Sequence, residues 1–278
     1  MVGICDYAWG LPSATVRFSV SSATDRGLVR QVNEDSYVDT PPIFAVADGM
    51  GGHAFGDRAS QATARALTAL ASAQPAAVVN VLEAISAASV AVRAISQDEL
   101  AGTTLAGVAL VQDSPDRAPH WLVFNIGDSR VYGWNGLVLT QISLDHSAVQ
   151  ELVDDGTISA EQAASHPQRN VITRAIGIDG DREPDVWLLP AGGEQTFVIC
   201  SDGLTKEMDD RAIESVLAVA SDVPVADRLV AAALASGGSD NVTVVVVRST
   251  VVPTSRGDAS GSSPRDLPAH LEVTHPRR

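Results

Sequence analysis

The segment PIFAVADGMGG, residues 42–52, joins an apolar run to an aspartate and a glycine-rich turn. The apolar part predicts a buried strand, because short runs rich in Ile, Phe and Val bounded by turn residues are typical of strands. Asp48 ends this strand, and Gly49 follows it directly. Glycines let the backbone turn sharply and bring a carbonyl oxygen close to an ion. The segment therefore predicts a strand that delivers a carboxylate and a carbonyl to one sheet edge.

Three further apolar runs carry an aspartate at one end. They read WLVFNIGD at residues 121–128, TFVICSD at 196–202 and SDNVTVVVV at 239–247. Each aspartate lies beside Gly, Ser or Asn, which favour turns. Together with the cluster Asn33-Glu34-Asp35, these carboxylates are expected to gather at one rim. Crowded carboxylates repel one another, and a hard divalent cation, Mg²⁺ or Mn²⁺, would relieve that repulsion.

Composition and charge exclude several classes of protein. Of 278 residues, 45% are hydrophobic and only 4% aromatic, so the core must be mostly aliphatic. A net charge of −15 and a pI near 4.6 argue against binding to nucleic acid or anionic membranes. The two cysteines, Cys5 and Cys200, form no CxxC pair for zinc. Cys200 precedes SDGLTKE instead of an arginine-containing loop, which excludes a cysteine-dependent phosphatase.

Membrane and export signals are missing from the sequence pattern. No apolar stretch approaches the roughly 20 residues that span a bilayer. Residues 1–16 lack the basic start and apolar block of a signal peptide. We therefore expect a cytoplasmic protein without a membrane span.

The order of periodic segments predicts an antiparallel α+β domain. Strands, two helices and more strands follow one another up to about residue 142, and strands and helices return after residue 185. Helices clustered in two places argue against alternating βαβ units. Residues 144–180 have weaker apolar periodicity and are expected to form a flap. The expected divisions are an N-terminal extension, one domain that includes the flap, and a polar, disordered tail, at residues 1–14, 15–249 and 250–278.

Seven motifs occur in an order that resembles one known family. They read RGLVRQVNEDS, VADGMGGHAFGDRAS, AGTTLAGVAL, FNIGDSRVY, NVITRAIG, CSDGL and SDNVTVVVV. Over residues 20–248 the chain resembles the metal-dependent protein phosphatases of type 2C, in their bacterial form. Single motifs of this kind are common, whereas seven in register are specific. The resemblance implies a four-layer α-β-β-α sandwich, with two antiparallel sheets packed face to face and helices on both outer faces.

The resemblance also implies an activity and partners. The activity is hydrolysis of phosphoserine and phosphothreonine on proteins by a water that two Mn²⁺ or Mg²⁺ ions activate, without a phosphoenzyme. The expected partners are phosphorylated proteins, among them a serine/threonine kinase or its substrates, and the chain is expected to be a monomer. The alternative is a metal-binding regulatory or docking module on the same fold, although such a module would be expected to lose metal carboxylates. An unrelated calcium-binding β protein would need acidic residues close together in sequence, and here they are spread widely.

By resemblance, the direct metal ligands are three aspartates and one backbone carbonyl. Asp48 bridges two metals, Gly49 adds its carbonyl, and Asp202 and Asp240 complete the set. Asp128 matches a carboxylate that bacterial members use for a third, weaker ion. Its neighbours Ser129 and Arg130 are expected to serve structure.

Glu34 and Asp35 are adjacent, so on a regular strand they point to opposite faces. The resemblance implies that Glu34 acts near the metals, through a water or from a second layer, and that Asp35 helps to hold waters. Which of them ligates directly stays open. Arg30 matches the family's phosphate-binding arginine, and its planar guanidinium suits two phosphate oxygens. Arg26 is the alternative.

The general acid is an open question. Eukaryotic members often carry a histidine after the DG pair, and this chain has Met50, which has no proton to donate. His53 is the nearest candidate in sequence. A role in shaping the turn explains this histidine equally well. His146 and His166 flank the expected flap, and neither is assigned a catalytic role.

Overall fold

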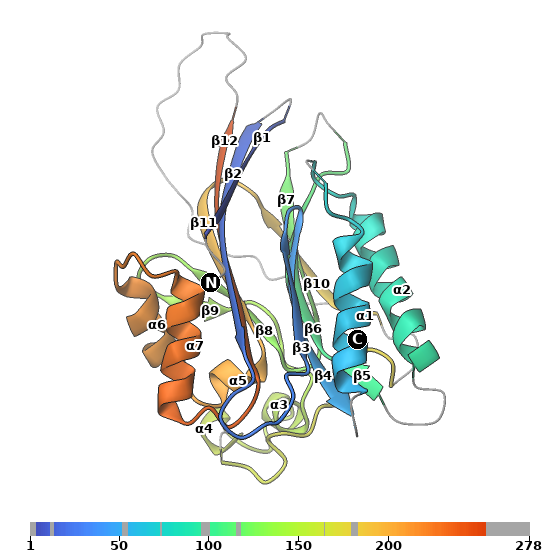
Figure 1. Ribbon diagram of the computed structural model, residues 1–278, viewed down its shortest axis with the longest axis vertical. Helices are drawn as coiled ribbons and strands as arrows, with labels where there is room; N and C mark the ends of the chain where they lie inside the picture. The colour runs from blue at the N-terminus through green and yellow to red at the C-terminus, as the bar shows by residue number, and fades with distance from the viewer. Residues whose placement is uncertain are drawn as a thin grey trace.

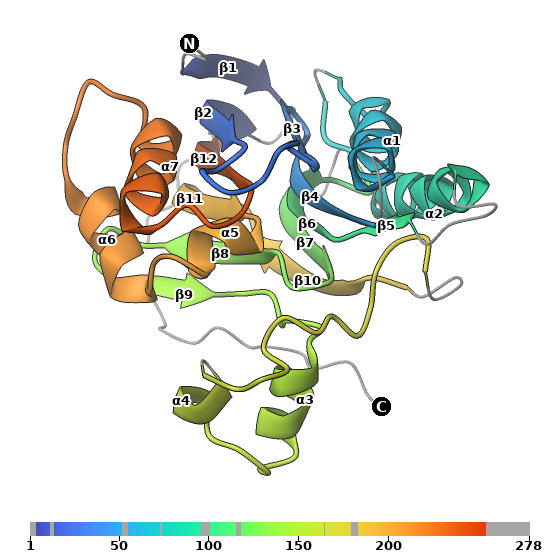
Figure 2. The same ribbon diagram turned by 60° about the horizontal axis from the view of Figure 1, so that its bottom comes forward.

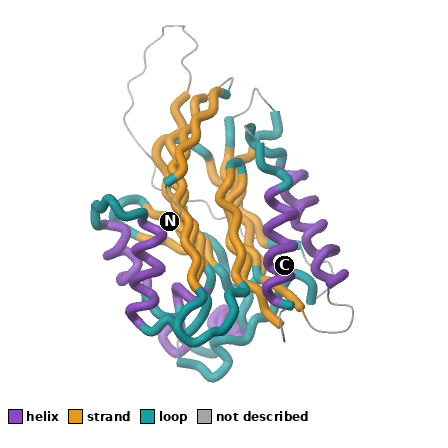
Figure 3. Tube along the Cα trace, in the orientation of Figure 1, coloured by secondary structure: helices purple, strands orange, loops and turns teal. Residues whose placement is uncertain are grey.

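The computed structural model describes residues 4–11, 14–51, 55–72, 74–95, 101–114, 118–163, 165–178 and 183–253. Two antiparallel sheets pack face to face, and helices cover both outer faces (Figure 1, Figure 3). The predicted four-layer α-β-β-α sandwich is therefore confirmed.

The first sheet has the strand order β1-β2-β12-β11-β8-β9. Its strands are β1 (Cys5–Gly10), β2 (Ala14–Asp25), β12 (Val242–Pro253), β11 (Gly193–Cys200), β8 (Arg130–Trp134) and β9 (Leu139–Gln141). The valine-rich β12 lies near the centre, antiparallel to both β2 and β11. Val244, Val245, Val246 and Val247 are all buried, because one face meets the second sheet and the other meets helices.

The second sheet has the strand order β10-β7-β6-β4-β3. Its strands are β10 (Asp185–Pro190), β7 (His120–Ile126), β6 (Leu105–Val111), β4 (Ile43–Gly51) and β3 (Asp35–Thr40). A short strand, β5 (Ala101–Thr103), pairs with the end of β4. This extra pairing continues β4 past Asp48 into the glycine-rich turn.

Helices shield the two outer faces. The second sheet is covered by α1 (Gly56–Thr68) and α2 (Val78–Ile95), and the first by α5 (Asp202–Thr205), α6 (Asp210–Ala218) and α7 (Val225–Ser236) (Figure 1). Between the sheets, Phe18, Phe44 and Trp121 are almost fully buried. The Phe18 ring lies 5.8 Å from that of Phe44 and 6.0 Å from that of Trp121, so aromatic packing holds the two sheets together.

The predicted flap region stands apart from the layers. It contains α3 (Ala148–Asp154) and α4 (Ala160–Ala163), neither of which has a buried residue. Figure 2 shows both helices projecting from one end of the sandwich. Helices with so little buried surface have few contacts to hold them in one position, whereas His146 and Ile176, near the ends of the region, are buried.

Two expectations need correction. Residues 5–10 were expected to precede the domain, yet they form β1, which pairs with β2 at the edge of the first sheet. The domain also continues beyond residue 249, because β12 runs to Pro253 and keeps its pairing with β2. Pairing of this kind satisfies backbone groups that would otherwise be left at a sheet edge. The predicted tail from residue 254 onward lies outside the described residues.

Within the part of the chain that the structure describes, one helix meets the length and composition of a membrane span, contrary to expectation. It is α2, with 18 residues and a mean hydropathy of 1.6. Its inward face contributes Val81, Ile85 and Val92 to the core over the second sheet. A buried core helix satisfies the same criteria of length and composition as a span.

Candidate metal centre

The acidic strand ends meet at one end of the sandwich. Asp35 begins β3, Asp48 lies near the end of β4, Asp128 follows β7, Asp202 follows β11 and Asp240 precedes β12. Neighbouring antiparallel strands place the end of one beside the start of the next. The strand ends that carry these aspartates therefore lie together, in the lower part of Figure 1.

Asp35 and Asp48 face each other across β3 and β4, as direct partners in the strand pair. Opposite residues in such a pair project on the same side of a sheet. The backbone of Asp48 is fixed by Thr103, the last residue of β5, and by Thr104, which precedes β6. Its N–H donates to the Thr104 hydroxyl at 3.0 Å, and its carbonyl accepts from the Thr104 N–H and the Thr103 hydroxyl, both at 2.9 Å. These bonds hold the Asp48 carboxyl in one place.

Gly49 has no room for a side chain. A Cβ there would collide with the carbonyl oxygens of Gly56 and Glu34. Its N–H donates to the Glu34 carbonyl at 3.2 Å. The glycine therefore lets β4 and the loop before β3 approach closely beside Asp48.

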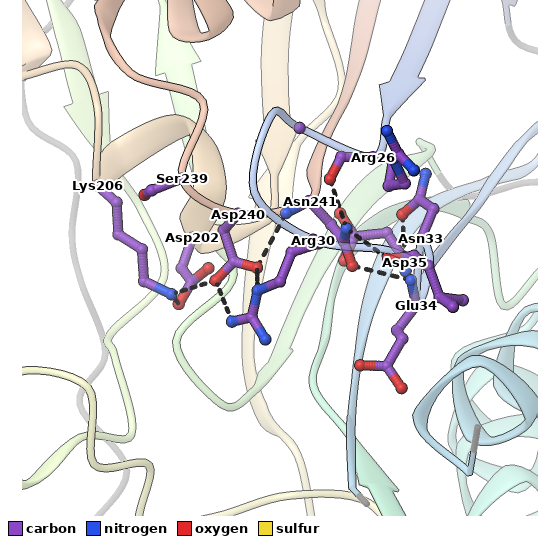
Figure 4. Close-up of polar contacts among 12 residues, drawn as sticks. Arg26, Arg30, Asn33, Glu34, Asp35, Asp202, Lys206, Ser239, Asp240 and Asn241 are labelled. Carbon is purple, nitrogen blue, oxygen red and sulfur yellow. Dashed lines mark hydrogen bonds and ion pairs between the residues drawn. The ribbon is translucent and has the colours of Figure 1, made fainter. Parts of the chain in front are cut away.

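Ser201 and Asn241 join distant segments at the site, and neither stood out in the sequence. The Ser201 hydroxyl donates to Asp35 at 2.8 Å and accepts from the Thr243 N–H at 3.0 Å. The Asn241 side chain accepts from the Glu34 N–H at 2.9 Å and donates to the carbonyls of Arg26 at 2.8 Å and Val32 at 2.9 Å (Figure 4). Asn241 thus ties both sides of the loop that carries Arg30 to the start of β12.

Two cationic side chains lie on Asp240. Arg30 makes two contacts with its carboxylate, Nε to Oδ1 at 2.8 Å and an N–H of Nη2 to Oδ2 at 3.0 Å. Lys206 Nζ lies 2.8 Å from Asp240 Oδ2 and 2.6 Å from Asp202 Oδ2 (Figure 4). Among the described residues, no three acidic, histidine or cysteine side chains form a ready-made metal site. The carboxylates nevertheless attract positive charge, because the Arg30 guanidinium contacts Asp240 and the Lys206 ammonium contacts both Asp240 and Asp202.

The electrostatics of the cluster show how strongly it favours added positive charge. Burial, and then mutual repulsion among the aspartates, raises the pKa of Asp48 well above its usual range. The same causes raise the pKa of Asp202, against the opposing effect of Lys206. Burial raises the pKa of Asp35 to about 7, with further repulsion from Asp202 and Asp240. The pKa of Asp128 rises to about 7 for the same reason, with Asp202 nearby.

Unpartnered oxygen atoms indicate what the cluster lacks. Asp35, Asp128 and Asp202 each have a buried Oδ1 without a hydrogen-bond partner. Buried polar atoms are normally paired, so orphaned carboxylate oxygens around one centre fit oxygen-ligated divalent cations. Asp240 differs, because contacts with Lys206 and Arg30 outweigh its burial and lower its pKa. The donor set therefore fits Mn²⁺ or Mg²⁺.

Glu34 lies to one side of this centre. Burial, followed by the nearby Asp57, raises its pKa. Figure 4 shows its carboxylate apart from those of Asp202 and Asp240. Of the adjacent pair, Asp35 is the one that faces Asp48. Arg26 turns elsewhere and donates to the Gln31 carbonyl at 3.4 Å.

The described histidines have structural partners outside the acidic cluster. His146 is buried, its Nδ1 accepts from the Gly127 N–H at 3.1 Å, and its Nε2 lies 3.2 Å from Asp185. This arrangement supports the turn that carries Asp128. His166 Nδ1 accepts from the Gln168 N–H at 3.2 Å. His53 lies outside the described residues.

Ser129 and Arg130, which follow Asp128 directly, make structural contacts, as the sequence predicts. The Ser129 hydroxyl lies 2.7 Å from that of Thr104, which connects the turn to the residue that holds Asp48. Arg130 donates to the Asp145 carboxylate, with Nη2 at 2.7 Å from Oδ2. Both side chains therefore connect parts of the fold and are not ligand candidates for a metal ion.

Comparison with known proteins places this arrangement in a family. Residues 25–236 match the family model described as Protein phosphatase 2C. The serine/threonine phosphatase stp of Listeria monocytogenes is 36% identical over 255 residues, which cover 85% of this chain and 98% of that protein. The crystal structure of the Mycobacterium tuberculosis phosphatase PstP/Ppp aligns with a TM-score of 0.75 and 38% identity, over 83% of this chain and 97% of that one. A PstP catalytic domain in complex with two manganese ions aligns with a TM-score of 0.75 and 35% identity, over 85% and 99% of the two chains.

Proposed function

This chain belongs to the protein phosphatase 2C family of metal-dependent serine/threonine phosphatases, and we propose that the aspartate cluster at its strand ends is the active site. The observation that supports this most directly is the set of buried, unpartnered oxygens on Asp35, Asp128 and Asp202. Buried carboxylates with raised pKa values and an unpartnered oxygen are characteristic of functional sites.

In this proposal, Asp48, Asp202 and Asp240 hold two divalent cations with the Gly49 carbonyl. When bound, such a pair lowers the pKa of a water molecule and offsets the charge of the phosphoryl oxygens. Asp35 completes the cluster from the strand opposite Asp48. Asp128 would hold a third ion, and Glu34 would act from outside the cluster. The Thr103 and Thr104 bonds to the Asp48 backbone keep the central carboxyl in position.

Arg30 is the proposed phosphate-binding residue. Its side chain is 53% exposed and contacts Asp240 through Nε and Nη2, so the remaining donors of its guanidinium can meet a substrate beside Asp240. The planar guanidinium can donate two parallel hydrogen bonds to phosphoryl oxygens. Because Asp240 is also a proposed metal ligand, the substrate phosphate and the cations would share one wall of the site.

No described histidine is proposed as general acid. Both ring nitrogens of His146 are engaged, by Gly127 and Asp185, and Met50 has no proton to donate. The role of His53 stays a proposal based on sequence alone.

The substrates are phosphorylated proteins. A kinase or its substrates as the client, a monomeric state and a cytoplasmic location are further proposals. The bacterial form of the motifs supports the proposed client. The net charge of −15 favours a monomer, because like-charged copies repel one another. Sedimentation of the purified chain and phosphoproteomics of a deletion strain would test them.

The activity should be measured on a phosphothreonine peptide in Mn²⁺, in Mg²⁺ and in EDTA. We expect turnover only with metal. Asp48→Asn should lower kcat by about 10²-fold or more, because it removes the charge at the centre of the cluster. The matched control is Asp222→Asn, an exposed aspartate in the loop before α7, which should leave kcat unchanged. Equal turnover in EDTA, or full activity of Asp48→Asn, would contradict the proposed site.

A further inference from the structure

Lys206 is the single lysine of the chain, and it lies in the acidic cluster. It caps the C-terminal end of α5, one helical turn after Asp202. Its Nζ contacts Oδ2 of Asp202 at 2.6 Å and Oδ2 of Asp240 at 2.8 Å. One ammonium group therefore bridges two carboxylates next to different strands of the first sheet, since Asp202 follows β11 and Asp240 precedes β12.

The ammonium occupies carboxylate oxygens that a metal would need. Asp240 Oδ2 contacts both Lys206 and Arg30, and its Oδ1 accepts from the Asn241 N–H and contacts Arg30. On Asp202, Oδ2 holds Lys206 while Oδ1 is buried and unpartnered. A cation that uses Oδ2 of Asp202 or Oδ2 of Asp240 must therefore replace the contacts of the ammonium.

The position of Lys206 follows from local geometry. Residues four apart on a helix lie on the same side, so an ammonium on Lys206 can reach back to Asp202. Its side chain is 29% exposed, whereas the side chains of Asp202 and Asp240 are 14% and 16% exposed. A partly exposed, flexible amine can leave without unfolding the strands that carry the aspartates.

We propose that Lys206 is a positioning residue of the metal centre, an intrinsic counter-ion that holds Asp202 and Asp240 together in the metal-free protein and competes with the divalent cation for them. The inference rests on the proposed function of the cluster. It predicts two opposite effects of removing the amine. The metal-free protein becomes less stable, because the carboxylates lose a neutralising charge. Metal binding becomes tighter, because the competitor is gone.

Manganese binding to EDTA-treated, dialysed protein should be measured by calorimetry, together with the melting temperature before and after metal. For Lys206→Met we expect the Kd for Mn²⁺ to fall about tenfold, as for loss of one partly buried ion pair. Its melting temperature should be lower than wild type without metal, and the increase on adding Mn²⁺ should be larger. Lys206→Arg, which keeps the charge, should restore the wild-type Kd.

The control is Arg211→Met, which removes one positive charge from the exposed face of α6 and should leave the Kd unchanged. A residue that served only as a structural link would lower stability without tightening metal binding. An unchanged or weaker Kd in Lys206→Met therefore overturns the inference while leaving the two-metal site intact. Absence of Mn²⁺ binding to wild type overturns the proposed metal centre and the inference with it.

A second measurement does not depend on any variant. Because the chain has one lysine, protein labelled with ¹³C at the lysine side chain gives one lysine Cε signal in solution spectra. Titration with diamagnetic Mg²⁺ should shift this signal with the same Kd that calorimetry gives for Mg²⁺. A lysine signal that stays constant up to saturation would contradict displacement of the ammonium.

Discussion

At the scale of single residues, the site depends on side chains that hold the carboxylates as much as on the carboxylates themselves. Asn241 satisfies one N–H and two carbonyls of the loop before β3. An asparagine after an aspartate is also common in ordinary turns, so its sequence context does not reveal this role. Only the contacts in the folded chain identify it as the anchor of the Arg30 loop.

Replacing this anchor should affect substrate binding. Asn241→Ala leaves three backbone groups without partners, and we expect the free energy of unfolding to fall by about 1–3 kcal/mol. KM for a phosphopeptide should rise several-fold, because the loop that positions Arg30 loses its attachment. Urea unfolding and steady-state kinetics measure the two effects.

Asn135→Ala is the matched control for this change. Asn135 also bonds backbone groups, the N–H groups of Leu137 and Val138, in an exposed turn between β8 and β9. We expect a loss of stability with no change in KM. An unchanged KM in Asn241→Ala would show that Asn241 does not position Arg30 for substrate binding.

At the scale of elements, strands and flap differ in how they are held. β4 is paired on both sides and carries Asp48, whereas α3 and α4 have no buried residues. Elements with few buried contacts move more easily and tolerate change. We therefore assign chemistry to the strand ends and, as a proposal, substrate preference to the flap.

The flap proposal predicts a difference between substrates. Val171→Ser replaces an apolar side chain that is 46% exposed on this segment with a smaller polar one. We expect kcat/KM for a phosphothreonine peptide to fall about fivefold, equivalent to about 1 kcal/mol of lost contact, with hydrolysis of nitrophenyl phosphate unchanged. Val219→Ser, at an exposed valine beyond α6, is the control and should alter neither substrate. Equal losses on peptide and aryl phosphate would count against a flap role.

At the scale of the whole molecule, the cluster makes stability depend on pH and metal together. The pKa values of Asp35 and Asp128 rise to about 7 in the folded chain, whereas an unfolded aspartate titrates near about 4. Between these values the folded state binds more protons than the unfolded state. The free energy of unfolding of the metal-free protein therefore falls as pH rises through this range. Below about pH 4, the usual pKa of an unfolded aspartate, the trend is reversed. There, groups with lowered pKa values, such as Asp185 and Asp240, make the free energy of unfolding rise with pH.

We expect the melting temperature of the EDTA-treated protein to decrease from about pH 5 to about pH 8, as buried carboxylates ionise. Mn²⁺ should raise it more at the higher pH, because the cation stabilises the ionised form. Differential scanning calorimetry in matched buffers measures both trends. Asp128→Asn should flatten the pH dependence, since it removes one of the titrating groups. A melting temperature that rises over this range without metal would contradict the assignment.

Much of the fold could be predicted because its information is local. The buried runs ending at Asp48 and Asp202 are β4 and β11, and the run that starts at Val242 is β12. Helices α1, α2, α6 and α7 lie where the apolar periodicity changes. The edge strand β1 was missed, since Cys5–Gly10 has one buried residue and little alternation to mark it. Edge strands are defined by pairing more than by sequence pattern.

The sequence by itself determined the buried strands, the aspartates at their ends and, through seven ordered motifs, the family. It could not decide which side chains meet. Glu34 and Asn241 are 207 residues apart, Asp35 and Ser201 are 166 apart, and Lys206 bonds Asp240 across 34 residues. Such contacts exist only after two sheets pair in register and pack, because side-chain periodicity specifies a face and not a partner. The tertiary structure therefore decided that Asp35 faces Asp48, and that the one lysine of the chain lies between Asp202 and Asp240, two of the proposed metal ligands.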